Sequence, residues 1–434
     1  MGKQNSGESE DVIEGKLSQK QLDAMVDLHM RFLEGRIGGR RAILKNADLT
    51  GLSVAGKDLR QVDFTGCLMV EMDLSEADFQ EARLYACNLT GSNLNNANFM
   101  RADLRGASIE NGTLRDINLE KADLRVGGFS SDGNYDTGEG VNFRGADLTG
   151  AKMSGALVSS ADFSDAIMAG ANMTGADLSN AKMEGADLSS ANFVGAKLKG
   201  ANMKAAILAG VDMNHISELE VDLVDAITDE NIGTSISDLD EPLVKKIETH
   251  REWVGSAGAS GEQLDLSDFD LRTLESLKQE KLTAIKAQNA KFFGMNLYQV
   301  EMQSAQLDGA DFRRCDMEKA DLRGSSFKAA RFNHSSLKGA NFDPLLFGAK
   351  GASERFSPCS FEGASLTYAD FKGCKMRSAN FKGADLSHAD LSNCDLREAD
   401  FTDAKMHGTK LEGANTEEAI IPSGPVFKLK AKDE

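Results

Sequence analysis

The stretch that decides the fold is residues 171–190, ANMTGADLSNAKMEGADLSS. A small residue, a polar residue and a large apolar residue recur there every five positions, as in Ala171-Asn172-Met173 and Ala176-Asp177-Leu178. A period of five matches neither the 3.6 residues of an amphipathic helix nor the 2 of a strand. The pattern therefore predicts a repeat architecture, in which each unit adds one piece to a growing stack.

The same register extends over most of the 434 residues. Its large positions form four runs with 53 units in total, at 49–124, 143–213, 292–342 and 361–411. The small and large residues of a unit point to one side of an extended segment, so each unit is one side of a coil, and coils stack about 4.8 Å apart. The period of five does not fix the number of sides. A twenty-residue recurrence suggests four sides, which would turn the following residues into interior ladders: Phe292, Phe312 and Phe332; Phe361, Phe381 and Phe401; Cys67 and Cys87; Cys374 and Cys394.

This A(D/N)LxG repeat resembles the pentapeptide repeat family, and the resemblance covers roughly residues 42–227 and 264–421. It implies a mainly β fold built as a right-handed quadrilateral β-helix. All five prolines lie outside the uninterrupted runs, as expected if a proline would remove a hydrogen-bond donor between coils. We expect two such solenoids, each preceded by a short helical cap and joined by an acidic, partly helical linker.

Two segments outside the repeat share the pattern Leu-x6-His-x2-aromatic-aliphatic, followed by glycines and then by the repeat. Because the open end of a solenoid exposes strand edges, we interpret each copy as an amphipathic helix that caps the first coil. A ligand-binding element is the alternative for these histidine–aromatic pairs. The predicted cap residues are His29, Phe32 and Leu33 in the first copy and His250, Trp253 and Val254 in the second.

These features divide the chain into six parts. Residues 1–16 are a disordered tail, 17–41 the first cap, 42–227 the first solenoid, 228–263 the linker and second cap, 264–421 the second solenoid, and 422–434 a C-terminal tail. The C-terminal tail is expected to fold back over the last coil, with packing against a second molecule as the alternative.

Two interruptions break the register, at 127–140 (GGFSSDGNYDTGEG) and 343–358 (DPLLFGAKGASERFSP). We expect each to be a loop that replaces most of a coil, with a register slip of one residue. Loops on a rigid scaffold are frequent binding sites, although a tolerated insertion is the alternative. The candidate partner-binding residues in the first loop are Asp132, Asn134, Tyr135, Asp136 and Glu139.

All six cysteines occupy the small position of a unit, without a CxxC pair or a histidine at ligand spacing. They are expected to be inert interior thiols in a reducing compartment, which favours a cytoplasmic protein without metal or cofactor. The other histidines, His215, His334, His388 and His407, show no partner pattern in the sequence.

No catalytic motif is present, so the chain is not expected to be an enzyme. The family resemblance implies one alternative, a DNA mimic that modulates a type II topoisomerase. Of the net charge of −19, however, residues 214–284 carry −11, so the solenoids themselves hold little. A structural or envelope-associated component is a further alternative. The favoured function is a protein–protein interaction scaffold with an unknown protein partner. We expect no nucleic-acid partner, no transmembrane segment, and a monomer or a dimer formed through the solenoid ends.

Overall fold

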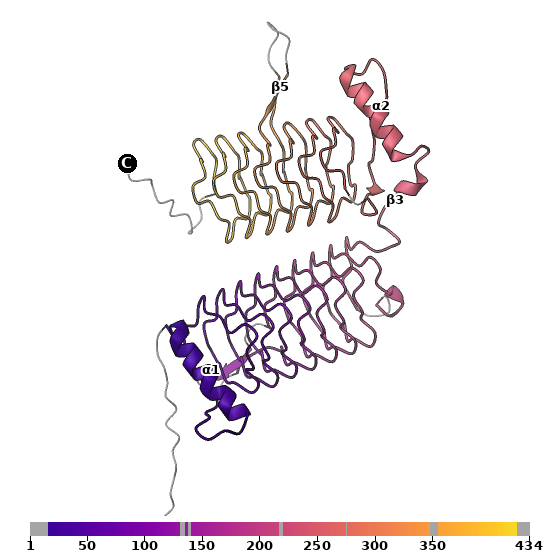
Figure 1. The fold of residues 1–434 in the computed structure, drawn as a ribbon. Coiled ribbons are helices and arrows are strands. Elements are labelled where there is room, and N and C mark those ends of the chain that lie inside the picture. Colours follow the sequence, from indigo (N-terminus) through magenta and orange to yellow (C-terminus); the bar gives the residue numbers. More distant parts are fainter. Residues whose placement is uncertain are drawn as a thin grey trace, which may run out of the picture. The chain divides into compact units, whose positions relative to one another are not determined.

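The computed structural model describes residues 16–130, 135–137, 140–216, 220–274, 276–347 and 355–422. Both predicted tails, apart from residues 16 and 422, lie outside these ranges. The chain forms two compact units, Met1–Asn231 (unit 1) and Ile232–Glu434 (unit 2), and each is described by itself. The fold is a mainly β solenoid with few helices (Figure 1).

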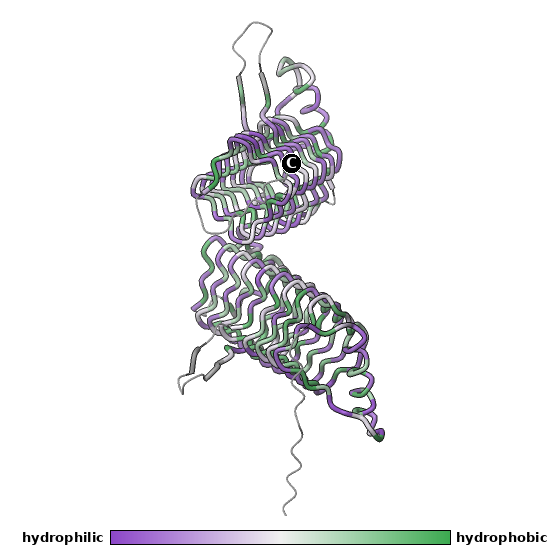
Figure 2. The backbone as a smooth tube through the Cα atoms, turned by 90° about the vertical axis from the view of Figure 1, so that its left-hand side faces the viewer, coloured by the Kyte–Doolittle hydropathy of each residue, from purple (hydrophilic) through white to green (hydrophobic). Residues whose placement is uncertain are grey.

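Each coil consists of four sides of five residues. Isolated parallel bridges join the middle residue of a side to its counterpart on the next coil, as in the series Asp58, Asp78 and Asn98. In each bridge the backbone bonds both ways: Leu59 N–H donates to Asp78 O at 2.7 Å, and Asp78 N–H donates to Lys57 O at 2.9 Å. The twenty-residue recurrence in the sequence is thus the length of one coil. Hydrophilic and hydrophobic residues alternate along every coil (Figure 2).

We name the four sides of unit 1 by their bridge series. Side A contains Asp48 and Leu68, side B Ser53 and Asp73, side C Asp58 and Asp78, and side D Asp63 and Arg83. Each side also includes the two turn residues that follow the large apolar residue. In unit 2, side D′ contains the series Glu301, Asp321, Asn341, Lys375 and Asp395.

The corners between sides use left-handed backbone. Glycine is common at this place, but many corners hold other residues at the same φ, such as Asn96 (φ 58°) and Arg101 (φ 58°) beside Gly106 (φ 67°). Left-handed backbone costs a non-glycine residue about 1–2 kcal/mol. The bonds between coils hold it in place, since Asn96 N–H donates to Arg115 O at 2.8 Å. Glycine is therefore favoured at corners but not required.

The small and large residues of the repeat fill the interior of each unit. The rings of Phe292 and Phe312 stack with centroids 4.7 Å apart, and Phe332 continues that ladder 5.0 Å further on. Phe361, Phe381 and Phe401 form a second ladder at 5.0 and 4.7 Å. All six cysteines are buried and free, and the Cys87 thiol donates to Phe64 O at 2.8 Å. Burial raises the pKa of the Cys67 thiol to about 11, which makes the thiolate scarce at neutral pH.

Two α-helices precede the coils. Helix α1 (Gln19–Leu33) buries Leu22 and Val26 against the core of unit 1, and α2 (Leu243–Gly255) buries Ile247 in unit 2. Before each helix, a short extended segment pairs in parallel with the first coil. Lys16 bridges Asp48 in unit 1, and β3 (Thr234–Ser235) pairs with β4 (Phe269–Asp270) in unit 2. Two 3₁₀ turns, η1 (Met213–His215) and η2 (Ile236–Asp238), complete the helical content of the described residues.

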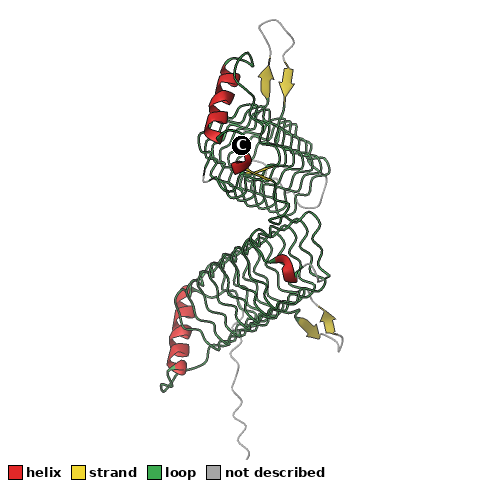
Figure 3. Cartoon of the chain, turned by 90° about the vertical axis from the view of Figure 1, so that its right-hand side faces the viewer, coloured by secondary structure: helices red, strands yellow, loops and turns green. Residues whose placement is uncertain are grey.

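Each register break contains a β-hairpin. Strands β1 (Gly128–Ser130) and β2 (Tyr135–Thr137) pair antiparallel, as do β5 (Leu345–Phe347) and β6 (Arg355–Ser357) (Figure 3).

The prediction that a loop replaces most of a coil at each break is wrong. Ser108 bridges Asn142 rather than position 128, and Ser326 bridges Ser360 rather than position 346. Each break is therefore an insertion of fourteen residues at a corner, and all four sides of the coil remain. The apparent slip of one residue arises because fourteen is one less than three repeats of five.

Candidate interaction surfaces

The first candidate surface is the hairpin predicted to bind a partner. Tyr135 and Asp136 lie in β2, where they pair with Ser130 and Phe129. Asp132, Asn134 and Glu139 lie outside the described residues, and so do the side chains of the other two candidates. The structure therefore gives this site a backbone frame, a two-stranded antiparallel ribbon that projects from unit 1 (Figure 3).

The corner beneath each hairpin has nearly the same sequence in the two units. Residues 102–108 read ADLRGAS and residues 320–326 read ADLRGSS. The glycine of each copy lies against the base of its hairpin. A Cβ on Gly106 would lie 3.2 Å from Gly127 Cα, and one on Gly324 would lie 2.7 Å from Leu345 Cβ. Glycine at these two corners therefore lets the hairpin leave the coil.

The Asp-Leu-Arg part of this motif forms a local clamp. Arg105 Nε and Nη2 donate to the two carboxylate oxygens of Asp103 at 2.8 Å each, and Arg323 binds Asp321 in the same way at 2.8 and 2.7 Å. The hydrogen bonds from Arg397 likewise lower the pKa of Asp395. Residues two apart on a strand lie on the same face, so the fork of the arginine meets the carboxylate flat against the coil. These arginines are thus held in place on sides D and D′.

The predicted cap histidines are fully buried and bind the first coil. The Nδ1 atom of His29 accepts the N–H of Ala42 at 3.2 Å, and Nδ1 of His250 accepts the N–H of Leu264 at 3.0 Å. In the first copy, Nε2 donates to Arg60 O at 3.0 Å. Each ring stacks on the predicted aromatic residue, Phe32 at 5.9 Å and Trp253 at 5.8 Å. Leu33 and Val254 are half-buried.

Both histidines must be neutral to accept those N–H groups. Burial lowers the pKa of His29, while the Arg60 carbonyl and the Asp58 carboxylate raise it and the Arg41 charge lowers it further. Burial also lowers the pKa of His250, with an opposing contribution from the Thr283 backbone. The geometry gives these residues a structural role within each unit, because the Nδ1 atom of each ring accepts a backbone N–H of the first coil.

Sequence reasoning missed a stack of aromatic side chains on unit 2. The ring of Tyr368 stacks on His334 at 5.0 Å and on His388 at 4.9 Å, and His407 meets His388 edge-on at 5.3 Å. The prediction that these histidines show no partner pattern is wrong. His334 and Tyr368 hold equivalent places on successive coils, but the second insertion lies between them, so the signal becomes visible only once its length is counted. His215 lies in η1, and its side chain is outside the described part.

Charge in unit 1 is segregated between sides, which a sum over segments hides. Side A has many more acidic than basic residues, whereas side D has an excess of basic ones. The charged residues of side A are Asp48, Glu71, Glu110, Asp162, Asp165, Glu184, Asp222 and Asp225 against Arg144, Lys182 and Lys204. Those of side D are Lys45, Arg83, Arg105, Arg125, Lys197 and Lys199 against Asp63, Asp103, Asp123 and Asp177. Side A thus carries a net negative charge, whereas side D is close to neutral, because Glu220 beside Lys199 leaves six basic against five acidic residues.

Coils of five-residue sides, parallel pairing and an interior of stacked small and large residues define a β-solenoid repeat protein. The pentapeptide repeats profile matches eight copies here, within residues 139–216, 305–343 and 355–415, and a related pentapeptide repeat region profile matches 40–130. The chain belongs to the pentapeptide repeat family. A search of curated proteins found no match.

Several solved pentapeptide repeat proteins are similar to this chain at low identity. QnrB1, a plasmid-mediated fluoroquinolone resistance protein, is 18% identical over 44% of this chain and 84% of its own, with a TM-score of 0.23. HetL, from the cyanobacterium Nostoc and involved in heterocyst differentiation regulation, is 18% identical over 92% and 97%, with a TM-score of 0.14. A thylakoid lumen protein of Arabidopsis thaliana is 23% identical over 30% and 68%, with a TM-score of 0.11. Such values carry no inference about partner or activity.

Two further searches covered only the described residues. No group of three or more His, Cys, Asp or Glu side chains there could hold a metal ion. Among the helices in the same ranges, none is long and apolar enough to cross a membrane.

Proposed function

We propose that this chain is a non-enzymatic scaffold that binds a partner protein through its hairpins and the adjoining faces of its solenoids. The observation that carries the proposal is the recurrence of one design in both units. In each, about four coils (17 sides in unit 1 and 16 in unit 2) are followed by an insertion of the same length that forms a hairpin over an Asp-Leu-Arg-Gly corner. Insertions that are merely tolerated would not be expected to have the same length in both units and to lie within one side of the same distance from the first coil.

Rigidity supports this function. Every coil is bonded to the next on its sides, and the arginine of each clamp is fixed by two hydrogen bonds. A surface that is already ordered loses little conformational entropy on binding. Phe356 in β6 is 52% exposed, which places a large apolar group on the projecting ribbon of unit 2. Aromatic residues of this kind are frequent anchors in protein interfaces.

We also propose that α1 and α2 act as caps, with module boundaries at 17–41 and 42–227 and at 228–263 and 264–421. The contacts of His29 and His250 with the first coil support this role. The buried free thiols favour a reducing compartment such as the cytoplasm.

Two deletions test the proposal without breaking the coil. Removing residues 126–139 restores the five-residue spacing from Leu124 to Phe143 and leaves Gly140 at the corner. Removing 344–357 with Pro358→Gly does the same between Phe342 and Phe361. We expect both variants to fold, as measured by circular dichroism and melting, and to lose partners captured by the intact chain from its native cell. Full retention of those partners by the double deletion would exclude the hairpins as the site.

A second candidate is a DNA mimic that acts on a type II topoisomerase. The acidic residues on side A of unit 1 favour it, because coil stacking brings eight of them onto one side. Inhibition of purified gyrase supercoiling at about micromolar concentration, abolished by Asp162→Lys with Asp165→Lys, would support this mimic over the scaffold.

A further inference from the structure

Side C of unit 1 ends two coils earlier than sides A and B. The last bridges of sides A and B are Asn202–Asp222 and Ile207–Ile227, whereas the last bridge of side C is Asn172–Asn192. Where the next strand of side C would lie, the chain instead runs through Asp212 into η1. Within the described residues, the strand around Asn192 therefore has an open edge.

Two backbone groups face this missing strand. One coil earlier, Asn192 N–H donates to Ala171 O at 2.9 Å, and Met173 N–H donates to Asn192 O at 2.8 Å. The same register directs Ala191 C=O and Phe193 N–H toward the missing strand. Neither takes part in a hydrogen bond between described residues, although nearly all buried strand groups in proteins are paired.

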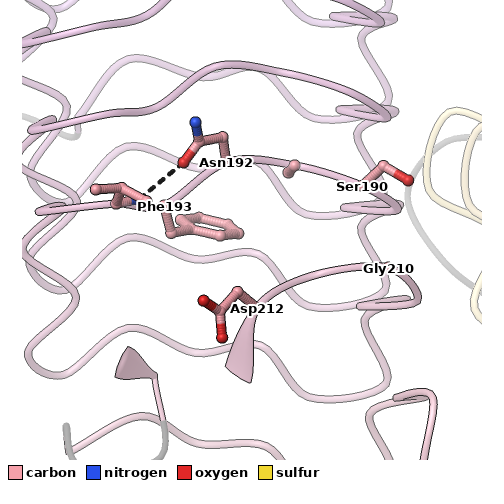
Figure 4. Close-up of a pocket in the computed structure, with 7 residues that line it drawn as sticks. Ser190, Asn192, Phe193, Gly210 and Asp212 are labelled. Carbon is pink, nitrogen blue, oxygen red and sulfur yellow. Dashed lines mark hydrogen bonds between the residues drawn. The ribbon is translucent and has the colours of Figure 1, made fainter. Parts of the chain in front are cut away.

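A cavity of about 230 Å³ lies beside this edge. Figure 4 shows the Phe193 ring above the Asp212 carboxylate, with open space between them. Asp212 is held in place because its Oδ1 accepts from Asn214 N at 3.0 Å. Val194, at the outer rim, is 54% exposed. The full lining is Ser190, Ala191, Asn192, Phe193, Val194, Gly210 and Asp212.

We call the cavity beside the open edge, between Phe193 and Asp212, the notch. We propose that the notch binds an extended segment of a partner protein, which adds one strand to side C. The segment would give an N–H to Ala191 O and accept the Phe193 N–H, as each coil does for the next. Strand addition to an open edge is a common mode of peptide recognition. The small cavity selects small side chains, and Asp212 favours a basic residue at one end. This inference rests on the proposed scaffold function and assigns that function a second, separate contact.

The probe is the capped peptide Ala-Asn-Ala-Thr-Lys, which follows residues 171–175 of the side C strand one coil earlier, with a small residue in place of Met173 and a basic one in place of Gly175. Amide hydrogen exchange is measured at Phe193 and, as an internal reference, at Met183, whose N–H is bonded to Asn202 O. In the free protein we expect fast exchange at Phe193 and slow exchange at Met183. Peptide at about 1 mM should slow Phe193 at least about tenfold and leave Met183 unchanged.

Two controls isolate the geometry. The matched peptide Ala-Pro-Ala-Thr-Lys lacks the N–H that would bind Ala191 O, so it should give no protection. Ser190→Tyr should fill the notch and abolish protection, whereas Ser160→Tyr, at a left-handed corner of another side, should preserve it.

Several outcomes would overturn the proposal. They are equal protection by the proline peptide, no protection at about 1 mM peptide, or a Phe193 amide already protected in the free protein. If the Phe193 amide is protected without peptide and this protection rises with protein concentration, the edge is covered by a second copy of the chain. If the protection does not depend on protein concentration, the edge is covered by residues 217–219. The hairpin deletions leave this experiment unchanged, so failure of the hairpin site and failure of the notch are distinguishable.

Discussion

Units 1 and 2 share a backbone plan but fill it differently. In unit 1 the phenylalanine stacks are isolated pairs, such as Phe79 with Phe99 at 4.8 Å. In unit 2 the rings form one connected network, in which Phe361 contacts Phe327 at 5.2 Å and Phe381 at 5.0 Å. The large position of the repeat thus requires an apolar side chain that points inward, but not one particular residue. Coil geometry comes from backbone pairing, and the interior adapts to it.

The largest expected effect tests whether the phenylalanine network makes unit 2 sensitive to a single truncation. Phe361→Ala removes a fully buried ring with several aromatic neighbours, and we expect it to lower the free energy of unfolding by about 3–5 kcal/mol. The loss should be confined to unit 2, as measured by hydrogen exchange resolved along the chain during urea unfolding. Met168→Ala is the matched truncation in unit 1. Equal loss in both units after either substitution would contradict the separation into two units.

The corner glycines under the hairpins give the next effect. Gly324→Ala adds a Cβ 2.7 Å from Leu345 Cβ at a left-handed position, so we expect a loss of about 2–4 kcal/mol. Gly106→Ala should lose less, because its nearest contact is 3.2 Å. Gly373→Ala, where a Cβ meets open space at similar φ, is the control and should cost about 1–2 kcal/mol. Thermal melting measures all three, and a control as damaging as Gly324→Ala would contradict the close approach.

The cap histidines predict a dependence on pH. Their pKa values are lowered in the folded state, so the unfolded chain binds protons first as the pH falls below the ordinary value of 6.5. Stability from both caps should therefore be present above pH 6.5 and decline as the pH falls below 6.5. Hydrogen exchange at Ala42 and Leu264, the N–H partners of the two rings, measures this in each unit. His29→Asn and His250→Asn should remove the decline, and an unchanged slope would assign it to other groups.

The surface clamps give the smallest effect. Arg323→Lys and Arg105→Lys each lose a two-point contact with an aspartate on a partly exposed surface. We expect both to change stability by less than about 1 kcal/mol, because exposed ion pairs contribute little. If the clamps lie in the interface with the partner, the substitutions should weaken the binding of the partner more than they lower the free energy of unfolding. Calorimetry and capture of the same partners, compared between the two units, check this.

The sequence predicted much of the fold and less of the sites. The five-residue period identified the repeat, and the His-x2-aromatic pattern located both helices. It did not reveal that the histidine rings accept the first backbone N–H groups of the coils, because that contact joins His29 to Ala42 through space. It also missed the stack of His334, Tyr368 and His388, since an insertion separates the first two along the chain.

The notch shows the same limit. The register continues without a visible break to residue 213, so the sequence predicts another strand on side C. The structure instead has η1 there, although Asp212 accepts the N–H of Asn214 just as the middle residues of the regular strands accept the N–H two residues on, as Asn172 does from Thr174.

By itself, the sequence determined which residues point inward and that coils must stack, because side-chain alternation and a fixed period leave no other way to bury the apolar positions. Tertiary structure alone decided which side each surface residue joins, where the hairpins leave, and which strand edge remains open. Those properties depend on neighbours one full coil away, or one coil plus an insertion, and a pattern with a period of five carries no record of that distance.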